Sequence, residues 1–277
     1  MKLGVQGNAW KKQWEDDFSA VIKHVGNLNF DFIEIVLTSL YEINIPLMQK
    51  QIKDSNLEVC TSAILPEYYD ITSNYSSVRR NGIDFLKSCV LTSKELGASL
   101  FSGIIYAKHF KQPENRNQKD LWKYAAEGLH EVALYAKKLG VTIGIEPVNR
   151  YETCLINTYE QALTLKNIIG EPNVKIHLDT FHMNIEEKSI YETIKRAKDN
   201  LCHLHLNEND FGIVGTGQVD FYSLIKALKE IDYKGYASFE SVIDIEGDYV
   251  WRKLAASSED LIIEGKEYVE EVIRNVT

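Results

Sequence analysis

The feature that most constrains this chain is a set of four short apolar runs, each of which ends in a polar residue. The runs VTIGIE, VKIHLD, LCHLH and YASFE end at Glu146, Asp179, His205 and Glu240, and turn residues and a helical pattern follow them. Near-continuous apolar runs are typical of strands that are buried on both faces of a parallel sheet. Because α/β barrels carry their chemistry at the carboxyl ends of such strands, an enzyme is the leading interpretation.

The alternation of apolar runs with amphipathic stretches extends along the whole chain. Strands are predicted at residues 2–6, 32–37, 58–64, 99–103, 141–146, 174–179, 201–206 and 236–240, and helices at 15–26, 46–55, 76–96, 117–139, 158–169, 187–199, 220–230 and 250–273. This pattern matches a closed (β/α)8 TIM barrel, which typically needs about 250 residues. An open doubly wound sheet is the main alternative, but no G-x-G-x-x-G turn follows the first strand. No linker interrupts the pattern, so we expect residues 1–277 to form a single TIM-barrel domain.

The composition argues against nucleic-acid and membrane partners. A net charge of −9 argues against a basic nucleic-acid-binding face, so we expect no nucleic-acid partner. No apolar stretch approaches the roughly 20 residues of a membrane span, and the N-terminus lacks the apolar core of a signal peptide. Cys60, Cys89, Cys154 and Cys202 show no C-x-x-C spacing, which favours free thiols over disulfides or zinc ligands. We therefore expect a cytoplasmic protein with no membrane partner.

The four polar residues that end the apolar runs could form one metal site. The tips of consecutive barrel strands lie side by side, so Glu146, Asp179, His205 and Glu240 can converge across the barrel mouth. Three carboxylates and one imidazole suit Mn²⁺, Mg²⁺ or Co²⁺ better than structural zinc, which prefers thiolate and imidazole. Alternatively, each carboxylate could cap the turn or helix that follows it. Four such residues in one topological row favour the metal site.

Further polar residues lie close to these strand ends in the sequence. Glu152 lies six residues after Glu146, and His182 lies three residues after Asp179, so both could touch a substrate. Taken alone, Glu152 could equally be a solvated loop acid, and His182 a packing or helix-start histidine.

The remaining features have weaker interpretations. His177 and His203 are expected to be hydrogen-bonded residues of the barrel interior rather than catalytic residues. Long loops are expected around residues 66–74 and 106–119, where Tyr106 and His109 could belong to a pocket lid. The GTGQVDF stretch at 215–221 is explained as well by a tight turn before a helix as by a phosphate loop.

The strings GIEPVNRYE, VKIHLDTFHMNIEE, HLHLNEN followed by GTGQVDF, and GYASFE resemble the D-tagatose/D-psicose (allulose) 3-epimerase family. This family belongs to the wider xylose-isomerase-like barrels. The resemblance extends to Trp10 and Trp14 and to VWR at 250–252, so it covers nearly the whole chain. It implies that Glu146, Asp179, His205 and Glu240 bind one divalent metal, commonly Mn²⁺. It also implies that Glu152 and His182 contact the sugar near its reacting end.

The chemistry of such an enzyme is consistent with these residues. Epimerisation at C3 of a ketose removes a proton next to the C2 carbonyl, and a divalent cation would polarise that carbonyl and stabilise the enediolate. Inversion requires that the proton returns from the opposite face, so two bases are needed. The resemblance implies that Glu146 and Glu240 are these catalytic bases.

Two positions depart from the family pattern. The family's sugar-contacting arginine falls on Phe211, and a tryptophan of many members falls on His109. We expect both residues to contact the substrate. Exchange of a guanidinium for an aromatic ring removes up to about five hydrogen-bond donors. The identity of the sugar is therefore open, and a ketopentose, a deoxysugar or a larger glycosyl ligand remains an alternative to a ketohexose.

Three other functions are alternatives to a metal-dependent ketose 3-epimerase. A keto-sugar or inosose dehydratase, or another sugar isomerase on this barrel, would use the same proton abstraction. A base-excision-type endonuclease would need more metal-binding histidines than the 7 His present can supply, and a basic face. A non-catalytic sugar-binding protein would not need two opposed carboxylates. We expect a small-molecule sugar partner and a homodimer or homotetramer.

Overall fold

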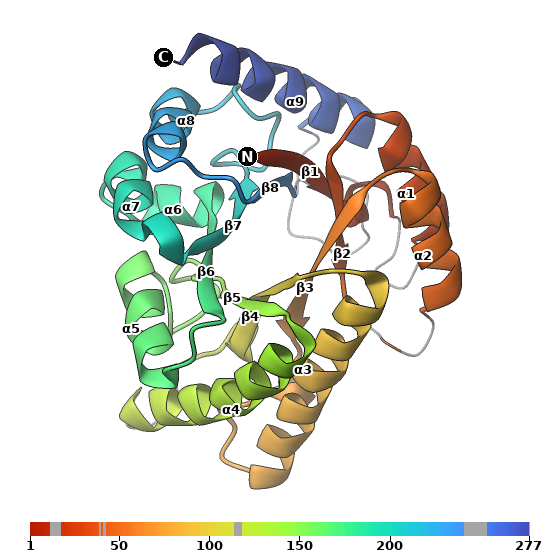
Figure 1. Ribbon diagram of the computed structural model, residues 1–277. Coiled ribbons are helices and arrows are strands. Elements are labelled where there is room, and N and C mark those ends of the chain that lie inside the picture. Colours follow the sequence, from red (N-terminus) through yellow and green to blue (C-terminus); the bar gives the residue numbers. More distant parts are fainter. Residues whose placement is uncertain (12–17, 39, 41–42, 114–117, 241–253, 277) are drawn as a thin grey trace.

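Eight parallel strands close into one barrel in the computed structural model, which describes residues 1–11, 18–38, 40, 43–113, 118–240 and 254–276. Each strand pairs with its sequence neighbours, and β1 also pairs with β8, as Figure 1 shows. The strands are β1 (Lys2–Gln6), β2 (Phe32–Val36), β3 (Glu58–Leu65), β4 (Leu100–Lys108), β5 (Thr142–Ile145), β6 (Val174–Asp179), β7 (Leu201–Leu206) and β8 (Tyr236–Phe239). The (β/α)8 fold predicted from the sequence is confirmed.

Helices surround the barrel and connect its strands (Figure 1). They are α1 (Ser19–Asn27), α2 (Ile45–Asp54), α3 (Ser76–Leu96), α4 (Gln118–Leu139), α5 (Tyr159–Ile169), α6 (Thr180–Glu186), α7 (Ile190–Ala197), α8 (Phe221–Glu230) and α9 (Ser258–Asn275), with short 3-10 turns at Gly7–Trp10, Glu67–Tyr69 and Lys198–Asn200. Parts of three predicted helices, together with Trp14 and the VWR string at 250–252, lie outside the described residues.

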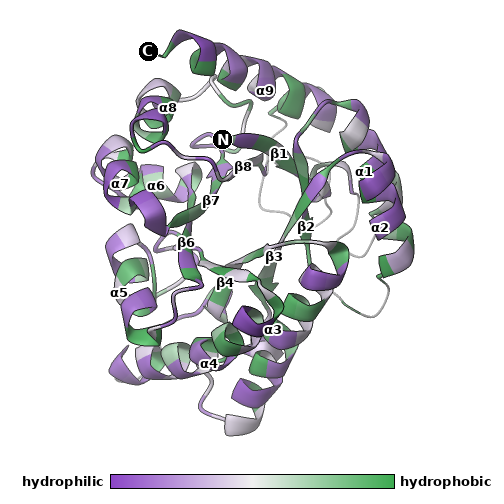
Figure 2. Cartoon of the chain, in the orientation of Figure 1, coloured by the Kyte–Doolittle hydropathy of each residue, from purple (hydrophilic) through white to green (hydrophobic). Residues whose placement is uncertain are grey.

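Local signals explain where several helices begin and end. Gly97 follows α3 with φ +91, a left-handed conformation that glycine adopts without steric penalty. Thr158 and Gln161 form a complete capping box at the start of α5. The apolar faces of the helices turn toward the strands and their polar faces toward solvent, as Figure 2 shows.

Two predicted boundaries are wrong. Tyr106 lies inside β4 rather than in a loop, and its side chain is fully buried with its hydroxyl donating to the carbonyl oxygen of Ile156 at 3.1 Å. β4 continues to Lys108 because the pairing with β3 shifts after Ile64, which brings Leu65 beside Lys108. The segment 180–186, for which no helix is predicted, forms α6, and the helix predicted at 187–199 is the shorter α7.

The interior of the barrel changes in polarity along its axis. At the amino ends of the strands, Phe32, Cys60 and Leu100 form a small apolar cluster with Tyr236 packed against it. Farther along β2 the interior becomes polar, with the fully buried Glu34. The barrel is therefore closed by apolar side chains at one end and carries its polar groups toward the other.

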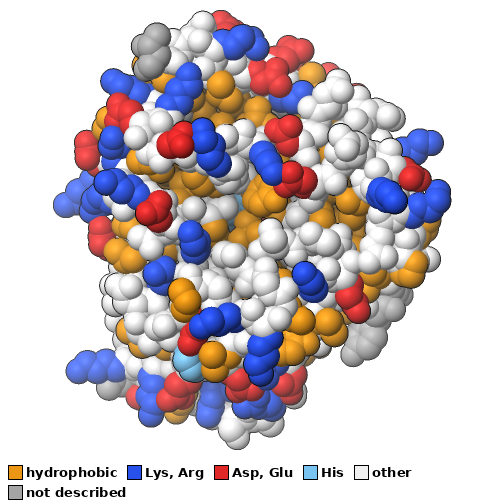
Figure 3. Space-filling view, viewed as in Figure 1, with side chains coloured by type: hydrophobic (Ala, Val, Ile, Leu, Met, Phe, Trp, Pro, Cys, Tyr) orange, Lys and Arg blue, Asp and Glu red, His pale blue; other side chains and the backbone are white. Residues whose placement is uncertain are grey.

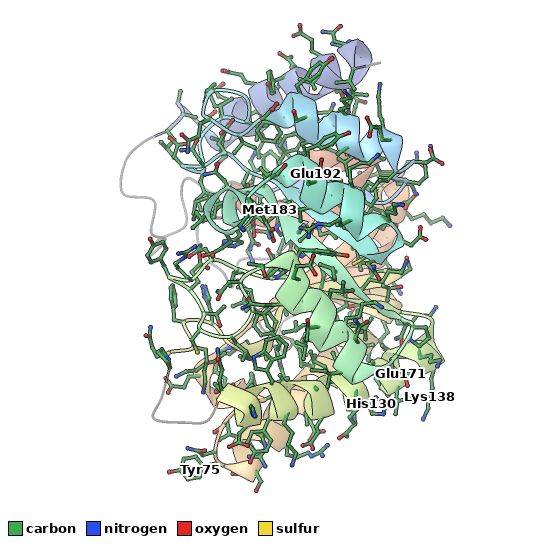
Figure 4. The ribbon with its side chains drawn as sticks, turned by 90° about the vertical axis from the view of Figure 1, so that its left-hand side faces the viewer. Tyr75, His130, Lys138, Glu171, Met183 and Glu192 are labelled. Atoms are coloured by element: carbon green, nitrogen blue, oxygen red, sulfur yellow. The ribbon has the colours of Figure 1, made fainter. Side chains whose placement is uncertain are left out.

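The two ends of the barrel face opposite sides of the molecule. In Figure 4, Tyr75 at the start of α3 lies on the side of the loops that follow the strands, whereas Lys138 and Glu171 lie on the other side. In Figure 3, basic and acidic side chains are interspersed across the face that is shown. Within the described residues, no helix is both long enough and apolar enough to pass through a bilayer. All four cysteines are free, as expected.

Candidate active site

Four side chains meet at the carboxyl ends of four neighbouring strands. Glu146 follows β5, Asp179 ends β6, His205 lies in β7 and Glu240 follows β8. Ligand atoms of Glu146, Asp179 and His205 all lie within 4.8 Å of one another. Nδ1 of His205 lies 2.9 Å from Oε2 of Glu240 and 3.6 Å from Oε1 of Glu146. The structure thus brings together the four residues that the sequence placed in one row.

The ligand atoms of this cluster that lack a hydrogen-bond partner fit a divalent cation. Oδ2 of Asp179 and Nδ1 of His205 are buried and make no well-aligned hydrogen bond within the described part of the chain. Buried polar atoms rarely lack a partner, so atoms of this kind indicate a ligand site. Three carboxylates with one imidazole form a donor set suited to Mn²⁺, Mg²⁺ or Co²⁺.

Asp179 shows how the alternative interpretation, that a strand-end carboxylate caps the following helix, is compatible with a metal site. Its Oδ1 accepts a hydrogen bond from the backbone N–H of Phe181 at 2.8 Å, which caps the first turn of α6. Its Oδ2 faces the other ligand candidates. The same side chain can therefore cap a helix through one oxygen and hold a cation through the other.

The crowding of these charges shifts their proton affinities. Burial is the main reason that the pKa of Glu146 is raised to about 7. The pKa of Asp179 is raised well above its usual value, first by burial and then by the charge of Glu240. Burial would also raise the pKa of Glu240, but the charge of His205, whose Nδ1 lies 2.9 Å from Oε2 of Glu240, outweighs it and lowers that pKa. A bound cation would relieve the repulsion among these carboxylates.

Three buried residues around the cluster were not identified from the sequence. Gln6 donates through Nε2 to Oε1 of Glu240 at 3.1 Å. Asn207 donates through Nδ2 to Oδ1 of Asp179 at 3.1 Å and to Oε2 of Glu240 at 2.9 Å. Glu34 lies beneath His205, with 3.1 Å between its Oε2 and Nε2 of the imidazole. The positions of these three residues in the sequence give no signal, because each contacts residues that are distant in sequence.

The expected substrate-contacting residues form a connected chain beside the cluster. Nε2 of His109 lies 2.9 Å from Oε2 of Glu152, whose Oε1 accepts from Nδ2 of Asn149 at 2.7 Å. Nδ1 of His182 lies 2.9 Å from the same Asn149 nitrogen, and its Nε2 lies 3.6 Å from Oδ2 of Asp179. Burial raises the pKa of Glu152, but the hydrogen bond from His109 and the charge of His182 outweigh it and lower that pKa. Both Glu152 and His182 are therefore buried polar residues, not solvated or apolar-packed ones.

Phe211 lies next to this chain of residues. Its ring centroid is 4.1 Å from that of Phe181, and the Phe181 ring is 5.1 Å from that of His182. Phe211 adopts φ +59, an unusual conformation for a non-glycine residue. Its backbone N–H donates to the carbonyl oxygen of Glu208 at 3.2 Å.

The prediction that His177 and His203 are hydrogen-bonded residues of the barrel interior is confirmed for His203 only. His203 is fully buried and its Nε2 lies 2.8 Å from Oε2 of Glu34, as expected for a hydrogen-bonded interior residue. His177 is equally buried, but neither of its ring nitrogens makes a hydrogen bond within the described residues. Its ring instead packs edge-on against that of His205, with 4.0 Å between the centroids. Burial holds the pKa of His177 well below its usual value, so it packs as a neutral ring.

Comparison with known proteins places this chain in a family. A family model described as xylose isomerase-like TIM barrel matches residues 22–271. L-Ribulose 3-epimerase of Methylomonas sp. (strain DH-1) is 33% identical and covers 93% of this chain and 94% of its own. D-Psicose 3-epimerase of Agrobacterium fabrum is 28% identical, with 94% and 93% coverage. A crystal structure of D-allulose 3-epimerase from Methylomonas sp. in complex with D-allulose superposes with a TM-score of 0.90 at 31% identity, covering 98% of this chain and 96% of the other.

Proposed function

Because this chain belongs to the ketose 3-epimerases of the xylose isomerase-like TIM barrel family, we propose that it is a metal-dependent isomerase that inverts C3 of a free ketose. The observation that carries the proposal is the pair of carboxylates Glu146 and Glu240 beside one candidate metal cluster. They follow β5 and β8, which β6 and β7 separate, so they reach the cluster from different sides.

Each of the two carboxylates has one oxygen toward the cluster and a second oxygen directed elsewhere. For Glu240, Oε2 lies near His205, whereas Oε1 accepts from Gln6. For Glu146, Oε1 lies 3.6 Å from Nδ1 of His205, whereas Oε2 lies 3.5 Å from Nδ1 of His177. In the proposed reaction, one carboxylate takes the C3 proton and the other returns a proton to the opposite face. The cation, held by Glu146, Asp179, His205 and Glu240, would polarise the C2 carbonyl as a Lewis acid.

The residues beside the cluster supply the binding of the sugar in this proposal. Glu152 and His182 would hydrogen-bond hydroxyls near the reacting carbons. His109 and Phe211 would line the part of the pocket farther from the cation, where an aromatic ring favours a less polar end of the substrate. Mn²⁺ is the proposed metal, with Mg²⁺ or Co²⁺ as alternatives. A homodimer or homotetramer in the cytoplasm, with one domain per chain, completes the proposal.

The test is solvent exchange at C3. The metal-loaded protein is incubated in heavy water with a panel of ketohexoses, ketopentoses and deoxyketoses, and the products are followed by NMR and mass spectrometry. A C3 epimer with deuterium at C3 is the expected product. Loss of water from the sugar, or epimer formed without deuterium in either direction, would contradict the proposal. Glu171→Gln, a change in a mostly buried carboxylate that pairs with Lys137 on the opposite side of the barrel in Figure 4, is the matched control and should exchange at the wild-type rate.

A further inference from the structure

Glu34 is the one residue of the barrel interior, among those the structure describes, whose carboxylate joins side chains of two other strands and both interior histidines of β7. It lies in the middle of β2 and is fully buried. Its partners are Ser62 Oγ at 2.6 Å, Ser238 Oγ at 2.6 Å, His203 Nε2 at 2.8 Å and His205 Nε2 at 3.1 Å. A buried acid in an apolar strand requires partners of this kind.

Because the Glu34 carboxylate has four hydrogen-bond partners, each partner must supply the proton of its own hydrogen bond. An ionised carboxylate only accepts hydrogen bonds and offers about four lone-pair sites. Both serine hydroxyls donate to Glu34, and both imidazoles then donate through Nε2. In His205 this keeps a proton on Nε2, so only Nδ1, the nitrogen that faces Glu240 and Glu146, can offer a lone pair to a cation.

We propose that Glu34 is a positioning residue that fixes the tautomer and the ring orientation of His205, so that Nδ1 points at the metal. This inference rests on the metal site of the proposed function, but not on the reaction performed there. A carboxylate that accepts from the distal nitrogen of a metal-bound imidazole orients the ring and increases its basicity as a ligand. Glu34 acts through His205 and does not itself touch the substrate or the metal.

The rival interpretation is that Glu34 is itself a ligand in a second metal site. Glu34, Cys60 and His203 offer ligand atoms within 4.8 Å of one another. However, the four hydrogen bonds to Glu34 occupy its lone-pair sites. Cys60 is a buried thiol among the apolar side chains of Phe32 and Leu100, where a thiolate would be poorly solvated. We therefore expect one metal ion per chain rather than two.

The variant that tests the proposal is Glu34→Gln. A glutamine of the same shape has one acceptor oxygen with two lone pairs, so it cannot accept from both serines and both histidines, and its amide group would present a donor to one of these four partners. The chelator-stripped protein is titrated with Mn²⁺ by calorimetry, and bound metal is counted by elemental analysis. The Mn²⁺ dissociation constant should rise by roughly 10- to 100-fold. Ser62→Ala is the control, since it removes one partner of Glu34 but keeps the carboxylate, and it should change this constant by less than about threefold.

A measurement on the unmodified protein keeps the inference falsifiable if Glu34→Gln does not fold. In the Mg²⁺-loaded wild-type protein, ¹H–¹⁵N correlation spectra of the imidazoles should show His205 protonated at Nε2, with the signal assigned by its loss in His205→Asn. Protonation at Nδ1 would overturn the proposal. A second bound metal ion, an unchanged Mn²⁺ affinity in a folded Glu34→Gln, or an equal loss in Ser62→Ala would overturn it as well. If the affinity changes as expected but no ketose exchanges its C3 proton, the proposed function fails and the role of Glu34 stands.

Discussion

Replacing Asp70 by asparagine should destabilise this barrel more than most single substitutions, because it removes the carboxylate from a buried ion pair with Lys111. Oδ2 of Asp70 lies 2.9 Å from Nζ of Lys111, and only 4% and 1% of the two side chains are exposed. Oδ1 accepts from the N–H and the hydroxyl of Thr72 and from the N–H of Lys108. Asparagine can keep the Oδ1 contacts, but its amide N–H₂ would face the ammonium group.

The expected loss follows from the burial of the pair. Removal of one partner of a buried ion pair lowers the free energy of unfolding by about 3–5 kcal/mol. A loss of that size should lower the melting temperature by roughly 6–20 °C for a chain of this size class. The exposed ion pair of Asp54 with Lys50 is the matched comparison, and Asp54→Asn should lose no more than about 1 kcal/mol.

The effect of Asp70→Asn should also depend on pH. Burial raises the pKa of Asp70, but the hydrogen bonds from Thr72 and Lys111 outweigh it, so the pKa in the folded protein is below 3.8. A carboxyl group with a depressed folded pKa stabilises the protein above its unfolded pKa, and that contribution disappears as the pH falls below it. The difference in stability between wild type and Asp70→Asn, measured by urea unfolding, should be constant above about pH 5 and shrink below pH 3.8.

Two results would refute this reasoning. One is a loss below about 1 kcal/mol at pH 7, which would mean that water or a neighbouring group solvates Lys111 after the substitution. The other is a difference that grows as the pH falls.

Because His109 and Lys111 share one loop, the substitution should also weaken sugar binding, through the hydrogen bond between His109 and Glu152.

The remaining predictions concern the site itself. Asp179→Asn should lower metal occupancy and activity together while the circular dichroism spectrum stays unchanged; full metal content by elemental analysis would contradict the assignment. Glu146→Gln and Glu240→Gln should each reduce turnover by roughly 10²- to 10⁴-fold, and near-wild-type epimerisation by either variant would rule out the two-base scheme. Phe211→Arg should lower KM for tagatose or psicose, with less effect on a ketopentose or deoxyketose; equal or weaker ketohexose binding at unchanged metal content would show that Phe211 does not set specificity.

The barrel and its ligand row were predictable because both depend on local sequence. Each ligand candidate ends an apolar run, and the order of the strands places those ends together. α6 was missed because it is short and depends on Asp179, whose carboxylate was assigned to a metal rather than to a helix start. The extension of β4 over Tyr106 was missed because it depends on an irregularity in its pairing with β3.

The residues that support the ligands could not be found in the same way. Glu34 is one acid in the run FIEIV, and nothing near it in sequence indicates that His203, His205 and Ser238 surround it. Gln6 likewise meets Glu240 only because β1 and β8 close the barrel. Such contacts join opposite ends of the chain, so only the closed fold reveals them.

The loop that carries Phe211 is held by hydrogen bonds from its own backbone to its side chains: Asn209 and Asp210 accept the N–H groups of Gln218 and Gly212 at 3.0 Å each, and Glu208 accepts two more. Glu208 is fully buried, and its carboxylate accepts the backbone N–H groups of Gly215 at 2.9 Å and Val219 at 3.3 Å. The shape of the loop therefore depends on backbone groups and on Glu208, Asn209 and Asp210 rather than on the ring of Phe211. A lineage, or a directed-evolution library, could exchange Phe211 for residues that tolerate φ +59, such as asparagine, and through the proposed role of this position change the preferred sugar without first rebuilding the loop.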